Sequence, residues 1–327
     1  MKRWSYVPPN ETIWKGLRKH DVTSTESAAL FGMSPYMTFF QLYYNKREKV
    51  ITEIDMNERM LWGKFMENTI ARGIAAINGV KVRRMTSYIR IVDARMGSSF
   101  DFEIIGLIEK WDGPDTPLRA MYREHGVGVF EIKAVDYLVF RDKWETKDDG
   151  TIEAPQHIEI QAQHQLHVSG RKWSAIGVLV SGHTPKILVR NRFADVGDAL
   201  EFKVRQLWKR IAANDPPPPD YPEDADFVKK LYGYADPGKV YDASEDGKIA
   251  DLADQYADAL KREKLAKEDK TTAQAEIYRR IGEAERIIHP KFSLWSGSVG
   301  PSHIEAYDRD GYRGFKLIWK KEKKANG

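Results

Sequence analysis

The sequence predicts an α/β fold: a mixed central sheet flanked by helices, followed by a C-terminal helical arm and a small antiparallel sheet. Strand-like and helix-like segments alternate up to about residue 214, which is typical of a sheet with helical connections. Pro216–Pro219 then break the pattern, because consecutive prolines end a helix and favour a stiff, extended spacer. Beyond them, apolar residues recur at helical spacing among many charges, before short alternating runs close the chain.

The first helices are predicted before residue 80. A short helix over Thr25–Phe31 ends at Gly32, and a second helix covers Phe39–Lys46. A longer helix runs from about Asn57 to Ile77, where Asn78-Gly79 provides a termination signal.

Strands and two further helices follow. Apolar residues spaced four apart indicate a helix over Gln156–Val168, and a helix is also expected around Val196–Ala212. The predicted strands are Tyr88–Val92, Ser99–Ile105, Gly128–Ala134, Ala175–Val180 and Ile187–Asn191.

The proline run sets the expected domain boundaries. Residues 1–215 form an α/β core of ordinary single-domain size, 216–245 a proline-rich linker, and 246–327 a helical arm with a small β appendage. In the arm, the helical pattern from Ile249 to Ile288 predicts a helical hairpin or coiled coil. The appendage strands are expected at Phe292–Trp295, His303–Tyr307 and Tyr312–Trp319.

Composition excludes several classes of protein. Of 327 residues, 42% are hydrophobic and 11% aromatic, which is enough for a real core. Without cysteine there is no disulfide, thiolate metal site or thiol nucleophile. No stretch reaches the roughly 18 apolar residues of a membrane span, and no signal region follows the start, so we expect a cytoplasmic protein. The net charge of +4 is too small to indicate a partner.

The triplet Glu131-Ile132-Lys133 carries the strongest chemical signal. It lies in a run that otherwise has the composition of a buried strand, and its two charges face the same side because strand side chains alternate. Buried charge is costly unless it is paired or bound to a metal. The preceding strand-like run has Asp101 at its centre, and an acid beside Glu-x-Lys is the pattern of metal-dependent DNA-cleaving enzymes.

These residues suit a hard cation such as Mg²⁺, with Mn²⁺ as a substitute. Mg²⁺ prefers oxygen ligands and keeps several waters, so Asp101, Glu131 and the backbone oxygen of Ile132 would suffice. Lys133 could assist deprotonation of the attacking water if burial lowers its pKa. The alternative is an exposed Glu/Lys pair on an edge strand, since Glu-x-Lys is common.

Several blocks in order resemble the YqaJ-like viral recombinase family, to which phage lambda exonuclease belongs, in the PD-(D/E)xK nuclease superfamily. The resemblance covers about Leu17 to Gly182. Its blocks are Leu17–Ala29 with Gly32-Met33-Ser34-Pro35-Tyr36, Gly63–Glu67, Ser99–Asp101, Glu131–Lys133 and Ile160–Gly170.

The resemblance implies a role for each matching residue. Asp101 and Glu131 would be metal ligands, with Lys133 as the catalytic lysine. Glu67 would hold or orient metal-bound water, and Gln161 would orient the nucleophile or substrate. The family positions that bind the 5′-phosphate and DNA are matched by Arg18, Thr25 and Ser99.

Simpler structural roles exist for some of these residues. Thr25 could be a capping residue, Arg18 a surface charge, and Gln161 with Gln165 a solvated stripe. His164 and His167 lack a third ligand and are expected to be surface or packing residues.

The choice of acid stays open as well. The family usually has Gly where Phe102 follows Asp101, and the gap to Glu131 contains an insertion. Glu103, expected on the same strand face as Asp101, or Asp112 could therefore be the ligand instead.

The expected function is that of a Mg²⁺-dependent 5′-to-3′ exonuclease, encoded by a phage or prophage. The resemblance implies that it digests one strand of linear duplex DNA from its end and leaves 3′ overhangs for a single-strand annealing protein. A homo-oligomeric ring is possible, and no membrane partner is expected. The alternatives are a restriction- or repair-type endonuclease of the same fold and a non-catalytic DNA-binding scaffold.

Overall fold

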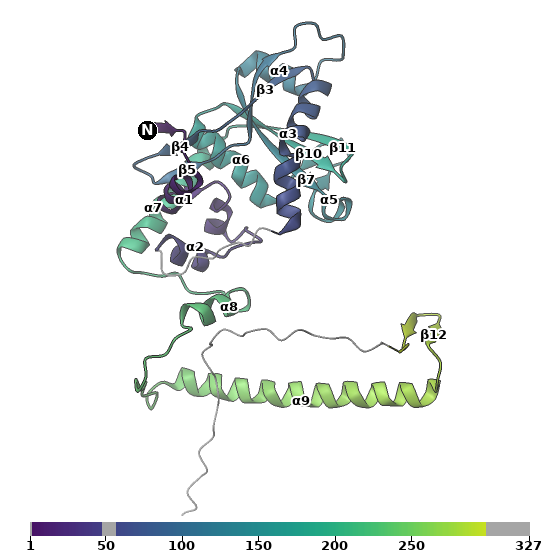
Figure 1. Cartoon of the computed structure of the whole chain (residues 1–327). Coiled ribbons are helices and arrows are strands. Elements are labelled where there is room, and N and C mark those ends of the chain that lie inside the picture. The colour runs from purple at the N-terminus through teal and green to yellow at the C-terminus, as the bar shows by residue number, and fades with distance from the viewer. Residues whose placement is uncertain (1, 48–56, 299–327) are drawn as a thin grey trace, which may run out of the picture. The chain divides into compact units, whose positions relative to one another are not determined.

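The computed structural model describes residues 2–47 and 57–298, and the chain divides into two compact units, Met1–Leu231 and Tyr232–Gly327 (Figure 1). The first unit contains a main sheet in the order β11–β10–β7–β6–β3, in which β7 and β10 are parallel and the other pairs antiparallel. These strands are β3 (Val80–Arg84), β6 (Phe102–Leu107), β7 (Gly128–Val135), β10 (Trp173–Val180) and β11 (Thr184–Asn191).

A smaller sheet in the order β1–β4–β5–β2 lies in the same unit. Its strands are β1 (Arg3–Tyr6), β2 (Val22–Thr23), β4 (Tyr88–Ile91) and β5 (Met96–Ser98). The short strands β8 (Glu145–Thr146) and β9 (Ile152–Glu153) pair with each other. The helices of the unit are α1 (Glu11–His20), the 3₁₀ helix η1 (Ser27–Phe31), α2 (Phe39–Lys46), α3 (Glu58–Ile77), α4 (Pro117–His125), α5 (Tyr137–Lys143), α6 (Gln156–Ser169), α7 (Ala194–Ala212) and α8 (Tyr221–Leu231).

Helices cover both faces of the main sheet. Ile70 and Ile74 of α3 belong to the same buried cluster as Phe130 and Ile132 of β7. On the opposite face, Ile158 of α6 belongs to a cluster with β10 residues. Because side chains alternate along a strand, the odd-numbered residues of β7 are directed towards the α6 side. The mixed α/β fold predicted from the sequence is thereby confirmed.

The predicted strand over Ser99–Ile105 is wrong at its start. β5 ends at Ser98 in the small sheet, and β6 begins at Phe102 in the main sheet. Between them, Phe100 is buried in a cluster with Val129 and Leu166. Because Phe100 packs in this cluster, the strand is interrupted between Ser98 and Phe102, and Asp101 lies in the connection between the two sheets.

Helix α8 lies in the segment 216–245, which the sequence suggested to be a linker. Phe227 is buried in a cluster with Phe40 of α2. The buried carboxylate of Asp224 accepts hydrogen bonds from Thr38 and Gln41, at 2.6 and 2.9 Å. These contacts place α8 in the first compact unit, which extends to Leu231.

The second unit has one long helix where a helical hairpin or coiled coil was predicted. Helix α9 runs unbroken over Gly247–Ile281 and ends at Gly282. The apolar pattern beyond it belongs to an antiparallel pair of strands, β12 (Arg286–His289) and β13 (Phe292–Trp295). The strands predicted after residue 298 lie outside the described residues. Among the described helices, none is long and apolar enough to cross a membrane.

Candidate active site

Strand β7 presents Glu131 and Lys133 on one face of the main sheet. Their neighbour Ile132 belongs to the opposite core, against α3. Only 6% of Glu131 is exposed, so its carboxylate is removed from bulk water. A carboxylate this buried requires partners, since an isolated buried charge is strongly destabilising.

Glu131 accepts hydrogen bonds on both carboxylate oxygens. Oε1 accepts from Lys133 Nζ at 2.7 Å and from Gln161 Nε2 at 2.6 Å. Oε2 accepts from Gln165 Nε2 at 2.7 Å. Gln161 and Gln165 lie one turn apart on α6 and are both buried, so the interpretation as a solvated stripe is wrong.

Asp101 lies beside this network, in the connection between β5 and β6. Its Oδ2 accepts a hydrogen bond from the backbone N–H of Ile132 at 2.9 Å. Burial raises the pKa of the Asp101 carboxyl well above its ordinary value, and the charge of Glu131 and a hydrogen bond with Glu67 raise it further. Three acidic side chains therefore lie in one region: Asp101 from the β5–β6 connection, Glu131 from β7 and Glu67 from α3.

The pKa of Lys133 is raised, whereas burial was expected to lower it. Burial does act in that direction, but the negative charges of Glu131 and Asp101 outweigh it and raise the pKa of Lys133 above its ordinary value. Without a cation between the carboxylates, Lys133 is therefore a charged hydrogen-bond donor. Its Nζ also donates to Gln161 Oε1 at 3.3 Å.

The alternative acids lie elsewhere. Glu103 is buried and forms ion pairs with Arg83 and Arg171, so the expectation that it shares a face with Asp101 in one strand is wrong. The physical reason is the break between β5 and β6, which removes Asp101 from the alternation of β6. Asp112 is exposed in the loop before α4. Neither residue lines the pocket described next.

A pocket of about 240 Å³ is lined both by the carboxylate–lysine network and by the side chains of Arg18, Thr25 and Ser99. Its lining residues are Trp14, Arg18, Thr23, Ser24, Thr25, Ser99, Asp101, Glu131, Lys133, Gln161 and Gln165. It thus contains every residue predicted for the site except Glu67 and Ile132. Segments far apart in sequence supply the two ends of one cavity.

The end of the pocket opposite Glu131 is built on α1. The guanidinium of Arg18 lies 4.5 Å from the Trp14 ring centroid, and its Nη2 donates to Thr25 Oγ1 at 3.4 Å. Trp14 Nε1 in turn donates to Ser99 Oγ at 2.8 Å. Stacking on an aromatic ring leaves the other guanidinium N–H groups available to an anion.

Glu67 lies on α3 and does not line the pocket. It is half-buried and lies 3.3 Å from Arg84 Nη2 in an ion pair, while a hydrogen bond links it to Asp101. The positive charge of Arg84 offsets part of the negative charge that the three acids concentrate here.

The two histidines of α6 are packing residues. His164 Nε2 lies 3.0 Å from the Gly97 carbonyl, and His167 Nε2 lies 2.9 Å from Glu201 Oε2. Burial lowers the pKa of His164 to about 3. Neither lines the pocket, so they belong to the core beneath it.

The donor set suits a hard cation that keeps much of its water. Among residues 2–47 and 57–298, no three histidine or acidic side chains are grouped so as to hold a metal by themselves. Burial is the main cause of the raised pKa of Asp101. Asp101 and Glu131 nevertheless place two carboxylates in one region, and the charge of Glu131 raises that pKa further by electrostatic repulsion. A cation would relieve it, with hydration and the Ile132 carbonyl as further oxygen ligands.

Four pocket residues had no place in the predicted site: Trp14, Thr23, Ser24 and Gln165. Gln165 follows Gln161 by one helical turn, so a four-residue spacing on the α6 face could have indicated it. Trp14 precedes Arg18 by the same spacing on α1. Helix α1 itself was not predicted, although Asn10 is a standard capping residue and accepts from Ile13 N at 3.0 Å.

Comparison with known proteins gives a family match and similar solved structures. Residues 13–172 match the model of the YqaJ-like viral recombinase domain. An alkaline exonuclease, LHK-Exo from Laribacter hongkongensis, is 17% identical, with a TM-score of 0.45 over 66% of this chain and 98% of that one. LHK-Exo in complex with dAMP is 16% identical, with a TM-score of 0.46 over 67% and 99%. No curated protein matches the chain significantly.

The family match and the acid–lysine site support a nuclease. Residues 13–172 are similar to the YqaJ-like viral recombinase domain, and the resemblance read from the sequence motifs is confirmed. The matched region begins in α1 and ends just before β10, so it includes the whole pocket.

Proposed function

We propose that this protein is a Mg²⁺-dependent exonuclease of the PD-(D/E)xK type that digests one strand of linear duplex DNA from its 5′ end. The observation that carries the proposal is the single pocket in which Arg18 and Thr25 lie at one end and Glu131 and Lys133 at the other. An anion-binding group beside a hydrolytic group suits a substrate with a terminal phosphate close to the bond that is cut.

Asp101 and Glu131 would hold the cation, with the Ile132 carbonyl as a third ligand and Glu67 orienting bound water. A divalent cation supplies charge neutralisation at the phosphorus and an acidified water when it is bound. Gln161 and Gln165 hold the Glu131 carboxylate in one orientation through their hydrogen bonds. The bond from Ile132 N fixes the Asp101 carboxylate in the same way.

Lys133 would donate a hydrogen bond to the attacking water or to a phosphate oxygen. Its raised pKa keeps it protonated while Glu131 and Asp101 are negatively charged and unneutralised. Neutralising those charges would lower the pKa of Lys133 towards the range in which an amine also accepts a proton. The lysine thus supplies positive charge and a proton site next to the reacting phosphate.

Arg18 and Thr25 would bind the terminal 5′-phosphate, with Ser99 between them and Asp101. A guanidinium forms paired hydrogen bonds with phosphate oxygens, and the Arg18 fork already faces the Thr25 hydroxyl. Such an end-binding pocket would restrict cutting to free ends. The product would be duplex DNA with a 3′ overhang, the substrate of a single-strand annealing protein in a phage-type recombination system.

The test uses linear and closed-circular duplex DNA of the same sequence, each with Mg²⁺ or with EDTA. Loss of the linear DNA alone, and only with Mg²⁺, is the expected result. Mn²⁺ should substitute. Cutting of the closed circle would contradict the exonuclease and indicate an endonuclease. Binding of DNA without any cutting would instead indicate a scaffold.

A further inference from the structure

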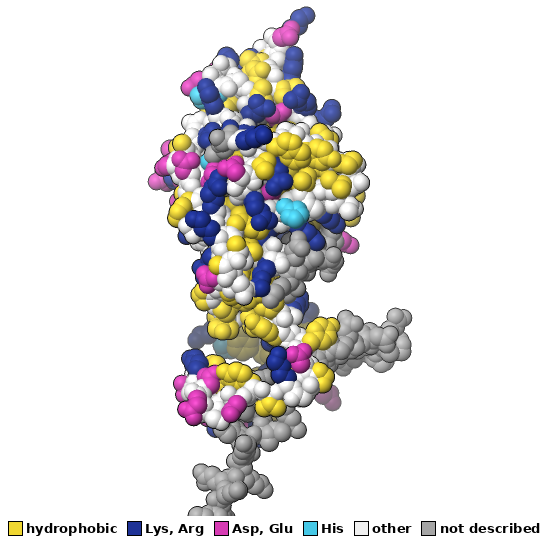
Figure 2. Space-filling view, turned by 90° about the vertical axis from the view of Figure 1, so that its left-hand side faces the viewer, with side chains coloured by type: hydrophobic (Ala, Val, Ile, Leu, Met, Phe, Trp, Pro, Cys, Tyr) yellow, Lys and Arg dark blue, Asp and Glu magenta, His cyan; other side chains and the backbone are white. Residues whose placement is uncertain are grey.

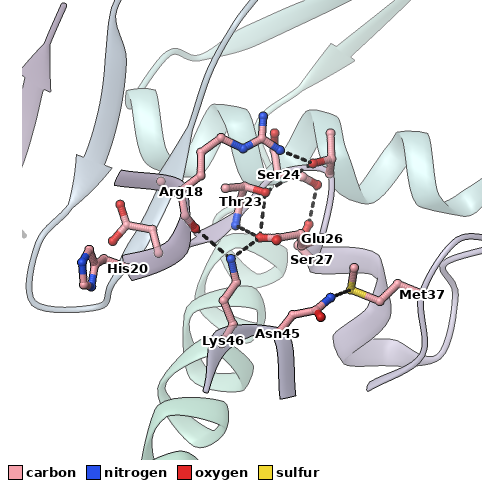
Figure 3. A network of polar contacts seen from close by, with 12 residues as sticks. Arg18, His20, Thr23, Ser24, Glu26, Ser27, Met37, Asn45 and Lys46 are labelled. Atoms are coloured by element: carbon pink, nitrogen blue, oxygen red, sulfur yellow. Dashed lines mark hydrogen bonds and ion pairs between the residues drawn. The ribbon is translucent and has the colours of Figure 1, made fainter. Parts of the chain in front are cut away.

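A buried ion pair lies beneath the anion-binding end of the pocket. Lys46, at the C-terminal end of α2, places its Nζ 2.7 Å from Glu26 Oε2, and the two side chains are only 4% and 19% exposed (Figure 3). A lysine is rarely buried to this degree, because its charge must leave water. Burial accordingly lowers the pKa of Lys46, while the charge of Glu26 raises it.

This pair connects two segments of the pocket wall. Lys46 Nζ also donates to the Arg18 carbonyl at 2.8 Å, which fixes the last turn of α1. Glu26 Oε2 accepts from both the backbone N–H and the hydroxyl of Thr23, each at 2.8 Å. Figure 3 shows Lys46 between Arg18 and Glu26, with contacts to both.

The hydroxyl groups continue this connection to the pocket surface. The Thr23 hydroxyl has one proton, which it donates to Glu26, so at 3.3 Å the Thr25 hydroxyl is the donor to Thr23 Oγ1. Thr25 in turn accepts from Arg18 Nη2 at 3.4 Å. Glu26 therefore determines the orientation of the groups that face an incoming anion.

The charge of Glu26 creates a difficulty that Lys46 removes. A carboxylate two hydrogen bonds away from an anion site repels a phosphate, because little water screens charges in a partly buried region. Lys46 carries the opposite charge at 2.7 Å and cancels most of this field. The segment Thr23–Glu26 thus keeps a strong hydrogen-bond acceptor without a net negative charge beneath the pocket.

We propose that Glu26 and Lys46 are positioning residues that set the preference of this pocket for a terminal phosphate. Glu26 orients the hydroxyl groups, and Lys46 makes its charge compatible with an anionic ligand. The inference rests on the proposed function, because it assigns a 5′-phosphate to the Arg18 end of the pocket. It adds residues that lie outside the pocket lining and act through Arg18, Thr23 and Thr25.

The experiment measures the ratio of the cleavage rates on 5′-phosphorylated and 5′-hydroxyl duplex ends. The variants are Lys46→Met, Glu26→Gln and the double variant, each checked by thermal melting. Binding of the corresponding oligonucleotides in EDTA provides a second readout that does not depend on catalysis. Glu103→Gln is the matched control, because it also removes a charge from a buried ion pair but lies outside the pocket.

Lys46→Met should reduce the rate ratio and the binding ratio about tenfold or more, because it leaves Glu26 uncompensated. Glu26→Gln should raise the ratios, because it leaves the charge of Lys46 uncompensated, and the double variant, which removes both charges, should return them to within about twofold of the native protein. Glu103→Gln should lower stability and leave both ratios unchanged.

A purely structural pair would lower rates on both ends equally and leave the ratios unchanged in all variants, which would overturn the inference. If Lys46→Met does not fold, Glu26→Gln still decides it, because the uncompensated charge of Lys46 should raise both ratios above the native values, and unchanged ratios would overturn the inference. Absence of cleavage by the native protein would overturn the proposed function alone, since the binding ratios in EDTA test the pair separately.

Discussion

At the scale of single residues, Glu131 is the centre of the site. It receives three side-chain hydrogen bonds from Lys133, Gln161 and Gln165, so its carboxylate is held before any ligand arrives. Preorganisation of this kind reduces the reorganisation needed at the moment of reaction. The charges of Glu131 and Asp101 in turn keep Lys133 protonated. The pKa of Lys133 thus depends on the charges of its neighbours.

We predict that Lys133→Ala abolishes hydrolysis while folding and DNA binding are retained. Lys133 contacts Glu131 and Gln161 at the pocket and contributes little to apolar packing. Loss of a positioned proton-transfer or charge-stabilising group lowers kcat by about 10²–10⁴-fold. The measurement is single-turnover cleavage of linear duplex DNA with Mg²⁺, together with thermal melting. Near-native cleavage would remove Lys133 from the mechanism.

A second prediction separates Asp101 from Glu103. Asp101→Asn should lower cleavage as severely as loss of Lys133, because the carboxylate beside Glu131 is a ligand in the proposed site. Glu103→Gln should retain cleavage at temperatures where it is folded, since Glu103 pairs with Arg83 and Arg171 away from the pocket. Loss of cleavage in Glu103→Gln but not in Asp101→Asn would show that Glu103 is the ligand.

Arg18 gives the third prediction. Arg18→Ala should make the cleavage rates on phosphorylated and dephosphorylated ends equal, because it removes a charge-assisted contact of about 1.5–3 kcal/mol. The native protein should prefer the phosphorylated end. Equal native rates on both kinds of end would contradict the role of Arg18.

At the scale of secondary-structure elements, β7 and α6 could be predicted and the connection holding Asp101 could not. Charges at Glu131 and Lys133 in an apolar run, and apolar residues spaced four apart in α6, are local signals. The break after Ser98 has no local signal, because Ser99-Phe100-Asp101 retains strand-like composition. Packing of Phe100 and the bond from Ile132 N to Asp101 set that break, and both are tertiary.

The buried polar face of α6 predicts a dependence of stability on pH. The pKa of His164 is lowered by burial from 6.5 to about 3. A lowered pKa in the folded state contributes stability that is present above pH 6.5 and is lost as the pH falls towards 3. Between pH 7 and pH 5 the free energy of unfolding should therefore fall by roughly 2 kcal/mol from this residue.

Urea denaturation of the native protein and of His164→Gln at both pH values measures this loss. The glutamine can still donate to the Gly97 carbonyl but does not titrate in this range. The variant should lose less stability on acidification than the native protein. An equal loss in both proteins would show that other groups cause the acid sensitivity.

At the scale of the whole molecule, the pocket belongs entirely to the unit Met1–Leu231. Figure 2 shows Lys and Arg side chains dispersed over the visible face, among apolar patches and acids, in keeping with the net charge of +4. The net charge alone could therefore not have located the pocket. The division between the two compact units falls after Leu231 and not at the proline run, because α8 is held in the first unit by tertiary contacts that local sequence does not reveal.

The final prediction concerns how much of the chain is needed for catalysis. We expect the fragment Met1–Leu231 to fold and to cleave linear DNA with Mg²⁺, because every pocket residue lies within it. A shorter fragment, Met1–Asp215, should be less stable. It loses Phe227 from the cluster with Phe40, and a buried phenylalanine contributes about 3–5 kcal/mol. It also leaves Thr38 and Gln41 without the buried carboxylate of Asp224.

Thermal melting and Mg²⁺-dependent cleavage of both fragments and the full chain decide the matter. Insolubility of Met1–Leu231 would show that residues beyond α8 complete the core. Equal stability of the two fragments would show that α8 does not belong to the catalytic unit. The expected order, in which only the longer fragment matches the full chain, would place the boundary of the nuclease domain after Leu231 and leave α9 with β12 and β13 for a role other than catalysis.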